Sequence, residues 1–199
     1  MVTFSHSGIR EIKNYAKKNN IPIMQDKGIS YLTTFIVKNQ IKNVLEIGTA
    51  IGYSAIMMAL SNQYVKITSV ERDEARYLEA LKNIKKFNLE DRINLIFKDA
   101  LDLKLDGKYD LVFLDASKGQ NINFFKNFSK NLESEGFIIT DNMSFHGFVD
   151  KDEDSIKSKN LRGLVRKIKE YKSFLEENED YETRFLDIGD GLAISRSKE

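Results

Sequence analysis

Residues 44–60 of the chain read VLEIGTAIGYSAIMMAL, and this stretch decides the fold. Residues 44–47 predict a short buried strand, residues 48–52 a tight turn with glycine at both ends, and residues 53–60 a helix packed back on the sheet. This order places the helix N-terminus, with its unpaired N–H groups, at the carboxyl end of a central strand. An open α/β sheet binds nucleotide-like ligands at that place.

The same letters exclude two common nucleotide motifs. A dinucleotide fingerprint, G-x-G-x-x-G, would need glycine at Ala50 and at Tyr53. A Walker loop would need Gly-Lys followed by Ser or Thr, and no such triplet follows. From this segment alone, residues 48–52 are also explained by a turn that only joins the strand to the helix. The ligand interpretation therefore depends on the residues at the ends of the later strands.

Composition predicts a single globular domain over residues 1–199. Hydrophobic residues make up 41% and charged residues 31% of the chain. The absence of cysteine excludes disulfides, thiolate metal sites and a cysteine nucleophile. No apolar run approaches the roughly 20 residues of a membrane span, and residues 1–20 lack the apolar core of a signal peptide. We expect a cytoplasmic protein with no membrane partner. Because the net charge is +1, a nucleic-acid surface would have to be local.

Two helices are expected before the first strand. Residues 5–18 carry apolar side chains at helical spacing, Pro22 breaks the pattern, and a second helix follows with Asp26 as its predicted cap. Because both helices precede the first strand, residues 1–40 form an N-terminal helical addition. We expect this addition to serve as a lid or as an oligomer contact.

Strands and helices then alternate along the chain. Strands are predicted over residues 65–70, 93–97, 111–114 and 137–140, and helices over residues 74–87 and 121–132. An acidic loop, residues 150–154, leads into a long helix, and residues 182–188 and 192–195 form a hairpin across Gly189-Asp190-Gly191. The predicted fold class is α/β, with a mainly parallel seven-stranded sheet, helices on both faces and a C-terminal antiparallel hairpin.

Two acidic residues at strand ends suit an adenosine ligand. Glu71 ends the second strand, slightly more than the usual 20 or so residues after the glycine turn, where a carboxylate accepts from both ribose hydroxyls. Asp99 follows the third strand in Lys98-Asp99-Ala100, where a carboxylate and a backbone N–H could contact an adenine edge. A solvated glutamate at a strand end is common, so Glu71 alone is a weak indication.

Three oxygen ligands are expected to meet at the ends of the next two strands. Asp115 follows the fourth strand, and Asp141 and Asn142 follow the fifth. Because two carboxylates are costly to bury together without a cation, these residues predict a metal site. Oxygen ligands favour Mg²⁺ before Mn²⁺ or Ca²⁺. Each residue on its own is equally well explained as the end of a strand.

Two further side chains near this site are candidates for proton transfer and substrate contact. Lys118 lies three residues beyond Asp115, and a nearby dication would favour its neutral amine, which makes it a candidate general base. An exposed surface lysine explains it equally well. His146 follows Asn142 and is a candidate substrate contact, although a lone loop histidine is more often solvated.

The ordered motifs resemble the class I metal-dependent O-methyltransferases, a group that includes catechol and caffeoyl-CoA O-methyltransferases. The motifs are EIGTxxGYS at residues 46–54, Glu71, FLDAxK at 113–118, TDN at 140–142 and GDGLA at 189–193. The resemblance runs from about Pro22 to Ser195, with one departure at Ala50, where many members have glycine.

This resemblance implies a Rossmann-like methyltransferase fold, S-adenosylmethionine as cofactor, Mg²⁺ (or Mn²⁺ or Ca²⁺) on Asp115, Asp141 and Asn142, and a homodimer. It implies Lys118 and Asp115 as the catalytic residues. It also assigns the cofactor to a larger set of residues: Glu46, Gly48, Thr49, Tyr53, Ser54, Glu71, Arg72, Asp99, Ala100 and Asp115.

The tail is similar to bacterial tRNA 5-hydroxyuridine methyltransferases, which make 5-methoxyuridine at the wobble position. The shared segments are LRxLVxKI at residues 161–168 and IGDGLAIS at residues 188–195. Residues 157–172 carry seven basic side chains against Glu170 alone, a stripe that could bind the phosphates of a tRNA anticodon loop through Arg162 and Arg166. A solvated basic helix face, balanced by later glutamates, stays equally open.

Three other functions compete with this interpretation. A methyltransferase for small catechols or phenols would keep every motif and change only the lid, residues 145–154. A nicotinamide dehydrogenase is disfavoured by the missing glycine fingerprint and by the terminal hairpin. A non-catalytic adenosine sensor would leave the Asp115, Asp141 and Lys118 set without a role.

Overall fold

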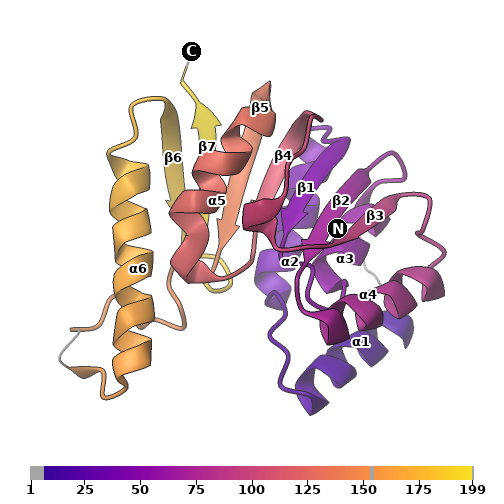
Figure 1. The fold of residues 1–199 in the computed structure, drawn as a ribbon, viewed down its shortest axis with the longest axis horizontal. Coiled ribbons are helices and arrows are strands. Elements are labelled where there is room, and N and C mark those ends of the chain that lie inside the picture. The colour runs from indigo at the N-terminus through magenta and orange to yellow at the C-terminus, as the bar shows by residue number, and fades with distance from the viewer. Residues whose placement is uncertain (1–6, 153–154, 199) are drawn as a thin grey trace.

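The computed structural model of the chain describes residues 7–152 and 155–198. Within these ranges seven strands form one sheet in the order β3-β2-β1-β4-β5-β7-β6 (Figure 1). The first five strands pair in parallel, whereas β7 runs antiparallel to both β5 and β6. The strands are β1 Asn43–Ile47, β2 Lys66–Glu71, β3 Ile93–Phe97, β4 Tyr109–Leu114, β5 Leu132–Asp141, β6 Tyr181–Leu186 and β7 Leu192–Ser197. The predicted α/β class and C-terminal hairpin are confirmed.

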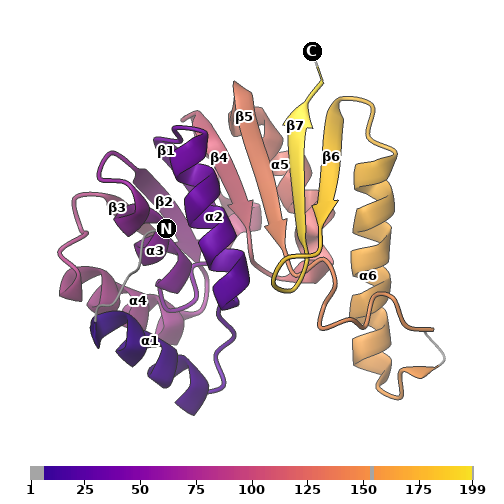
Figure 2. The same cartoon turned by 180° about the vertical axis from the view of Figure 1, so that it is seen from behind.

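Helices cover both faces of the sheet. Figure 1 shows α5 and α6 on one face, and Figure 2 shows α2 crossing the other, with α1, α3 and α4 beside it. No helix in the described ranges has both the length and the apolar composition needed to cross a bilayer. The helices are α1 Ser7–Lys18, α2 Asp26–Lys38, α3 Tyr53–Ser61, α4 Glu74–Lys86, α5 Asn121–Phe128 and α6 Lys159–Glu176.

Alternation along the strands divides the core into two clusters. In β1, Val44 packs in the cluster formed with α1 to α4, and the next residue, Leu45, packs in the cluster formed with α5 and α6. Both side chains are fully buried. A strand covered on both faces needs apolar residues at successive positions, which explains Val44-Leu45 in β1 and the apolar run from Leu111 to Leu114 in β4.

The helix predicted over residues 121–132 is shorter than expected. It ends at Phe128, a 3-10 turn spans Ser129–Asn131, and Leu132 already begins β5. The Asn131 side-chain amide donates to Leu105 O at 2.8 Å and to Gly107 O at 2.9 Å. These contacts with the loop before β4 hold residues 129–131 in the 3-10 turn, although the local sequence pattern predicts that the α-helix continues.

The N-terminal addition packs on the core. Gln25, not the predicted Asp26, occupies the cap position of α2, because Asp26 is already the first helical residue and its carboxylate pairs with Lys13 of α1. On α1, Gly8 faces the Phe87 ring so closely that an added Cβ would lie 2.7 Å from it. Ser5, the predicted start of this helix, lies outside the described residues.

Candidate active site

A cavity of about 360 Å³ opens at the carboxyl ends of β1, β2, β4 and β5. This is the end of the sheet at which the sequence places a ligand. The connection between α1 and α2 also reaches it through Pro22, Ile23, Met24 and Gln25. The predicted residues that line the cavity are Gly48, Glu71, Arg72, Asp99, Ala100, Asp115, Lys118, Asp141, Asn142 and His146.

The glycine turn lies against the end of β4. Gly48 has φ of 101°, and a Cβ at this position would lie 2.4 Å from Asp115 O, so only glycine fits. Ala50 also has a positive φ, 47°, which is unfavourable for a residue with a side chain. Its N–H donates to Glu71 Oε2 at 2.8 Å, and this bond holds the turn in place.

Glu71 is a buried carboxylate shared by two turns. Besides Ala50 N–H on Oε2, its Oε1 accepts from the backbone N–H groups of Arg72 and Asp73, each at 2.9 Å. An ionised carboxylate has about four acceptor positions, so three backbone bonds leave capacity for a ligand hydroxyl. Glu71 therefore both shapes the cavity and lines it.

Asp99 lies at the cavity rim. Its side chain accepts from Leu101 N–H at 3.0 Å and pairs with Arg72 Nη1 at 3.0 Å. The Leu101 N–H and then the Arg72 guanidinium hold the pKa of Asp99 below its usual range. These bonds keep an ionised carboxylate in a fixed place at the rim.

Four predicted cofactor residues lie beneath the cavity and do not line it. Glu46 is fully buried and accepts from the hydroxyls of Ser54 and Ser69, and the Ser69 hydroxyl is in turn hydrogen-bonded to Thr49. Burial raises the pKa of Glu46 to about 7. Tyr53 is buried as well, with Lys13 Nζ 5.8 Å from its ring centroid. This network supports the glycine turn from inside the protein.

Asp115, Lys118 and Asp141 lie together in the part of the cavity wall at the ends of β4 and β5. Lys118 Nζ donates to Asp115 Oδ1 at 2.8 Å. Burial, and then the negative charge of Asp115, raise the pKa of Asp141 to about 7. A carboxylate pair that resists double ionisation is the environment in which a bound cation is strongly favoured.

Asn142 completes this group and is oriented by a residue that our sequence reasoning missed. Its side-chain N–H donates to Asp190 Oδ2 at 3.0 Å, and the backbone N–H of His146 donates to Asp190 Oδ1. Asp190 is only 4% exposed. The sequence pattern Gly-Asp-Gly predicts a hairpin turn, and nothing in the pattern indicates that the aspartate side chain is buried.

Comparison with known proteins identifies the family. A model of the O-methyltransferase family matches residues 3–198. The chain belongs to the O-methyltransferase family. A flavonoid 3',5'-methyltransferase of Vitis vinifera is 31% identical over 203 residues, which cover 95% of this chain and 85% of the relative.

Two solved structures share the fold of this O-methyltransferase. A Staphylococcus aureus protein described as a "putative caffeoyl-CoA O-methyltransferase" is 36% identical, with a TM-score of 0.92 over 97% of this chain and 93% of that chain. A Bacillus cereus O-methyltransferase in complex with SAH is 23% identical, with a TM-score of 0.84 over 100% of this chain and 94% of that chain. The predicted Rossmann-like methyltransferase fold is thereby confirmed.

The two arginines predicted to bind substrate lie on α6 of this O-methyltransferase, outside the cavity. Arg162 is half-buried and Arg166 is exposed, and neither lines the cavity. However, α6 packs against the 3-10 turn Lys118–Gln120, which carries the candidate base. The N-terminal part of α6 also extends beyond the carboxyl ends of the strands (Figure 1). Glu153 and Asp154, the end of the predicted lid, lie outside the described residues.

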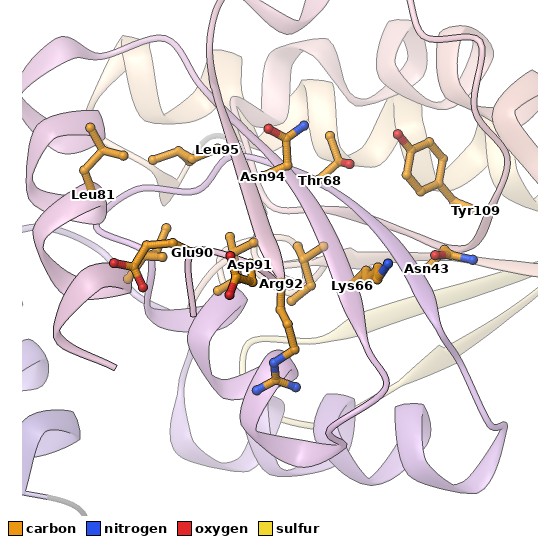
Figure 3. A pocket seen from close by; sticks show the side chains of 13 residues that line it. Asn43, Lys66, Thr68, Leu81, Glu90, Asp91, Arg92, Asn94, Leu95 and Tyr109 are labelled. Carbon is orange, nitrogen blue, oxygen red and sulfur yellow. The ribbon is translucent and has the colours of Figure 1, made fainter. Parts of the chain in front are cut away.

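A second cavity of about 470 Å³ lies at the amino ends of the strands (Figure 3). Asn43, Lys66, Thr68, Asn94 and Tyr109 contribute to its lining. The Arg92 guanidinium beside it donates to Ala59 O at 2.8 Å and to Asn62 O at 3.0 Å, which ties it to the end of α3. No residue predicted to bind cofactor, metal or substrate lines this cavity, so the chemistry of this O-methyltransferase belongs to the other end of the sheet.

Proposed function

We propose that this O-methyltransferase transfers a methyl group from S-adenosylmethionine to a hydroxyl with the help of a divalent cation, Mg²⁺ before Mn²⁺ or Ca²⁺. One observation carries the proposal. The glycine turn and Glu71 share a single cavity with the group Asp115, Lys118, Asp141 and Asn142. A donor and an acceptor bound there would meet between these two walls, and such alignment can supply roughly 7–11 kcal/mol of the barrier.

The cofactor would bind along the glycine-turn wall. Glu71 offers its remaining acceptor capacity to the ribose hydroxyls, and Asp99 with Ala100 lies where the adenine edge would be. Glu46, Thr49 and Ser54 act from below, through the hydrogen-bond network that supports the turn. Their contribution to cofactor binding is therefore indirect.

The metal-site wall, at the ends of β4 and β5, fits a hard cation. Burial and then the nearby charge of Asp115 raise the pKa of Asp141, and the Asn142 amide would supply a third oxygen. No cluster of three His, Cys, Asp or Glu side chains suited to a metal occurs in the described residues, and the proposed third protein ligand is this amide oxygen. When bound, the cation lowers the pKa of an acceptor hydroxyl and orients it.

Lys118 is the base in this proposal. Its Nζ is 2.8 Å from Asp115 Oδ1, so the amine lies beside the group that orients the acceptor. The side chain is only 11% exposed, so the proton would pass from the acceptor hydroxyl to Nζ with little bulk water nearby. Exclusion of water favours a reaction in which the sulfonium and oxyanion charges disappear together.

We propose 5-hydroxyuridine at the tRNA wobble position as the acceptor. Its hydroxyl lies next to a carbonyl oxygen, so it presents the same pair of adjacent oxygens as a catechol. A loop base is already unpaired, so it enters a pocket at little cost. The basic side chains of α6, next to the turn that carries Lys118, support this acceptor because they could bind the flanking phosphates.

A small phenol is the second candidate acceptor. The names of the relatives favour it, because they refer to caffeoyl-CoA and flavonoid substrates. Both acceptors use the same cavity chemistry and differ only in the need for the basic helix. The distinction therefore rests on α6 and not on the metal residues.

A charge-reversal experiment tests the acceptor. Arg162→Glu with Arg166→Glu should raise the KM for tRNA that carries 5-hydroxyuridine, and the loss should shrink as salt rises, because phosphate contacts are screened. Methylation of a free catechol by the same variant should stay nearly unchanged. Lys85→Glu with Lys130→Glu, two exposed lysines at the amino ends of the strands, is the matched control. A wild-type protein that methylates catechols and ignores hypomodified tRNA at any salt would establish the phenol instead.

We also propose that the chain forms a homodimer, as the family resemblance implies. A hollow of about 750 Å³ on the outer side of α2 is lined by Tyr31, Phe35 and Ile188, together with polar residues. Val37, on the same helix, is 45% exposed. Apolar surface of this kind suits a protein contact. Sedimentation should give twice the chain mass of 23.0 kDa, and a monomer at micromolar concentration would contradict the dimer.

A further inference from the structure

Asp190 is a buried carboxylate to which the proposed reaction assigns no role. It lies in the turn between β6 and β7, at the same end of the sheet as the carboxyl end of β5 (Figure 2). The glycines on both sides have positive φ, 64° at Gly189 and 83° at Gly191. A buried carboxylate is costly unless donors surround it, so its hydrogen bonds indicate what it does.

The donors all come from the loop that follows β5. Asn142 Nδ2 donates to Asp190 Oδ2 at 3.0 Å, and His146 N–H donates to Asp190 Oδ1. The His146 ring is near as well, with Nδ1 3.5 Å from Asp190 Oδ1. The backbone of Asp190 contributes too, because its carbonyl accepts from Ser144 N–H at 2.9 Å. One residue of the hairpin thus holds three positions of this loop.

The loop is strained, and the hairpin turn fits closely against it. Asn142, Phe145 and His146 have φ of 64°, 44° and 55°, values that residues with side chains rarely adopt. A Cβ at Gly191 would lie 2.5 Å from Ser144 Oγ and 2.7 Å from Ser144 N. Strain of this kind persists only where surrounding contacts over-determine it, and Asp190 provides the side-chain contacts that do so.

The bond to Asn142 decides which end of its amide is available. A side-chain amide has one donor end and one acceptor end. Because Nδ2 is used by Asp190, the end left for the cavity is the oxygen, next to Asp141. Asn142 and His146 both line the cavity, whereas Asp190 does not.

We propose that Asp190 is a positioning residue that turns the Asn142 amide oxygen toward the cation site and fixes His146 at the cavity mouth. The inference rests on the proposed function, because it gives the Asn142 oxygen its use. Asp190 contacts neither cation nor substrate and acts through the residues it holds. Hydrogen-bonded partners behind a metal ligand typically contribute 10- to 100-fold to metal affinity or activity.

Asp190→Asn tests the inference with almost no change in shape. The new amide offers an N–H to one of the two groups that a carboxylate accepted from, so Asn142 can flip and present its own N–H to the site. Binding of Mn²⁺, followed by electron paramagnetic resonance, should weaken about 10- to 100-fold. Calorimetry should show S-adenosylmethionine affinity nearly unchanged. Asp187→Asn, an exposed aspartate of the same hairpin, should leave both affinities unchanged.

A double-mutant cycle shows whether Asp190 acts through Asn142. In the Asn142→Ala background, Asp190→Asn should cause no further loss of Mn²⁺ affinity. A loss as large as in the wild-type background would overturn the positioning role, because the variant would then only loosen the fold. Equal Mn²⁺ affinity of Asp190→Asn and wild type would overturn it as well.

A second readout separates this inference from the metal proposal. In the protein without added metal, the Asn142 side-chain amide resonances, assigned by their loss in Asn142→Ala, should shift when Asp190→Asn removes the carboxylate acceptor. If the wild type bound no Mn²⁺, the metal proposal would fail while this spectrum still reported the orientation. Unshifted resonances in Asp190→Asn would overturn the contact itself.

Discussion

The two walls of the cavity are held by contacts of different range. On the glycine-turn wall, Ala50 bonds to Glu71 across 21 positions of the sequence, and Ser54 to Glu46 across 8. On the metal-site wall, Asn142 bonds to Asp190 across 48 positions. The glycine turn and Glu71 belong to one β-α-β unit, whereas the metal-site wall is complete only when the C-terminal hairpin lies beside β5.

This difference separates binding from chemistry. The glycine turn is held by bonds within its own β-α-β unit, and the residues of this wall are assigned to the cofactor. The metal-site wall brings Asp115, Asp141 and Asn142 together from two strands and orients the amide from a third segment. We therefore expect changes on one wall to leave the task of the other largely intact.

The largest effect is expected from Asp141. Asp141→Asn keeps the shape but removes a charge that the proposed cation needs, so methyl transfer should fall by more than the roughly 10- to 100-fold typical of residues behind a ligand. A chelator should have the same effect on the wild type, with recovery on addition of Mg²⁺. The rate of S-adenosylmethionine turnover measures both.

Cofactor affinity provides the control for Asp141. Because the cofactor would bind on the other wall, its dissociation constant should change little in Asp141→Asn. Asp106→Asn, in an exposed loop, should leave both rate and affinity unchanged. Full activity of Asp141→Asn in the presence of chelator would leave Asp115, Asp141 and Asn142 as ends of strands without a metal.

A smaller effect is expected from Glu71, on cofactor binding and not on metal binding. Glu71→Ala removes the acceptor for the ribose hydroxyls and for Ala50 N–H, so S-adenosylmethionine should bind more weakly by about 1.5–3 kcal/mol, or roughly 10- to 150-fold in Kd. Mn²⁺ affinity should be retained. Calorimetry below the unfolding temperature of the variant gives both values. Glu74→Ala, three residues further on and exposed, is the control, and unchanged cofactor affinity in Glu71→Ala would remove Glu71 from the site.

The same contrast explains which parts of the site the sequence could predict. Glu71, Asp115 and Asp141 each directly follow a predicted strand, so topology alone brings them to one edge of the sheet. Asp190 has its partners 44 and 48 positions away, and a Gly-Asp-Gly pattern is fully explained by a turn. No local pattern encodes that its side chain points inward.

The errors in the predicted fold have a similar origin. The helix expected to reach residue 132 stops at Phe128 because Asn131 bonds to the distant Leu105 and Gly107. Within β1, Glu46 lies between two buried apolar residues, and its partner Ser69 comes from β2. The motif predicts a cofactor contact for Glu46, and in the structure its buried side chain bonds to Ser54 and Ser69 beneath the turn.

The last prediction concerns Glu46 and the pH dependence of stability, and it involves neither binding nor turnover. Burial raises its pKa from 4.5 to about 7, and the hydroxyls of Ser54 and Ser69 and the charges of Asp115 and Glu71 face it. Between these two values the folded protein keeps a proton that the unfolded chain releases. The free energy of unfolding therefore falls as pH rises, by about 1.4 kcal/mol per pH unit from this group, and the loss is complete above about pH 7.

Glu46→Gln should remove this slope, because a neutral amide can still bond to both serine hydroxyls and binds no proton over the range. Urea unfolding between about pH 5 and about pH 8 measures this slope as the difference in the free energy of unfolding between variant and wild type. The contributions of other titrating groups largely cancel in this difference. As pH rises, the free energy of unfolding of the variant should increase relative to that of the wild type. Glu90→Gln, an exposed glutamate, should follow the wild type throughout. Parallel curves for Glu46→Gln and wild type would mean that the carboxyl beneath the glycine turn is ionised across the whole range, and the rigidity of that wall would then need another source.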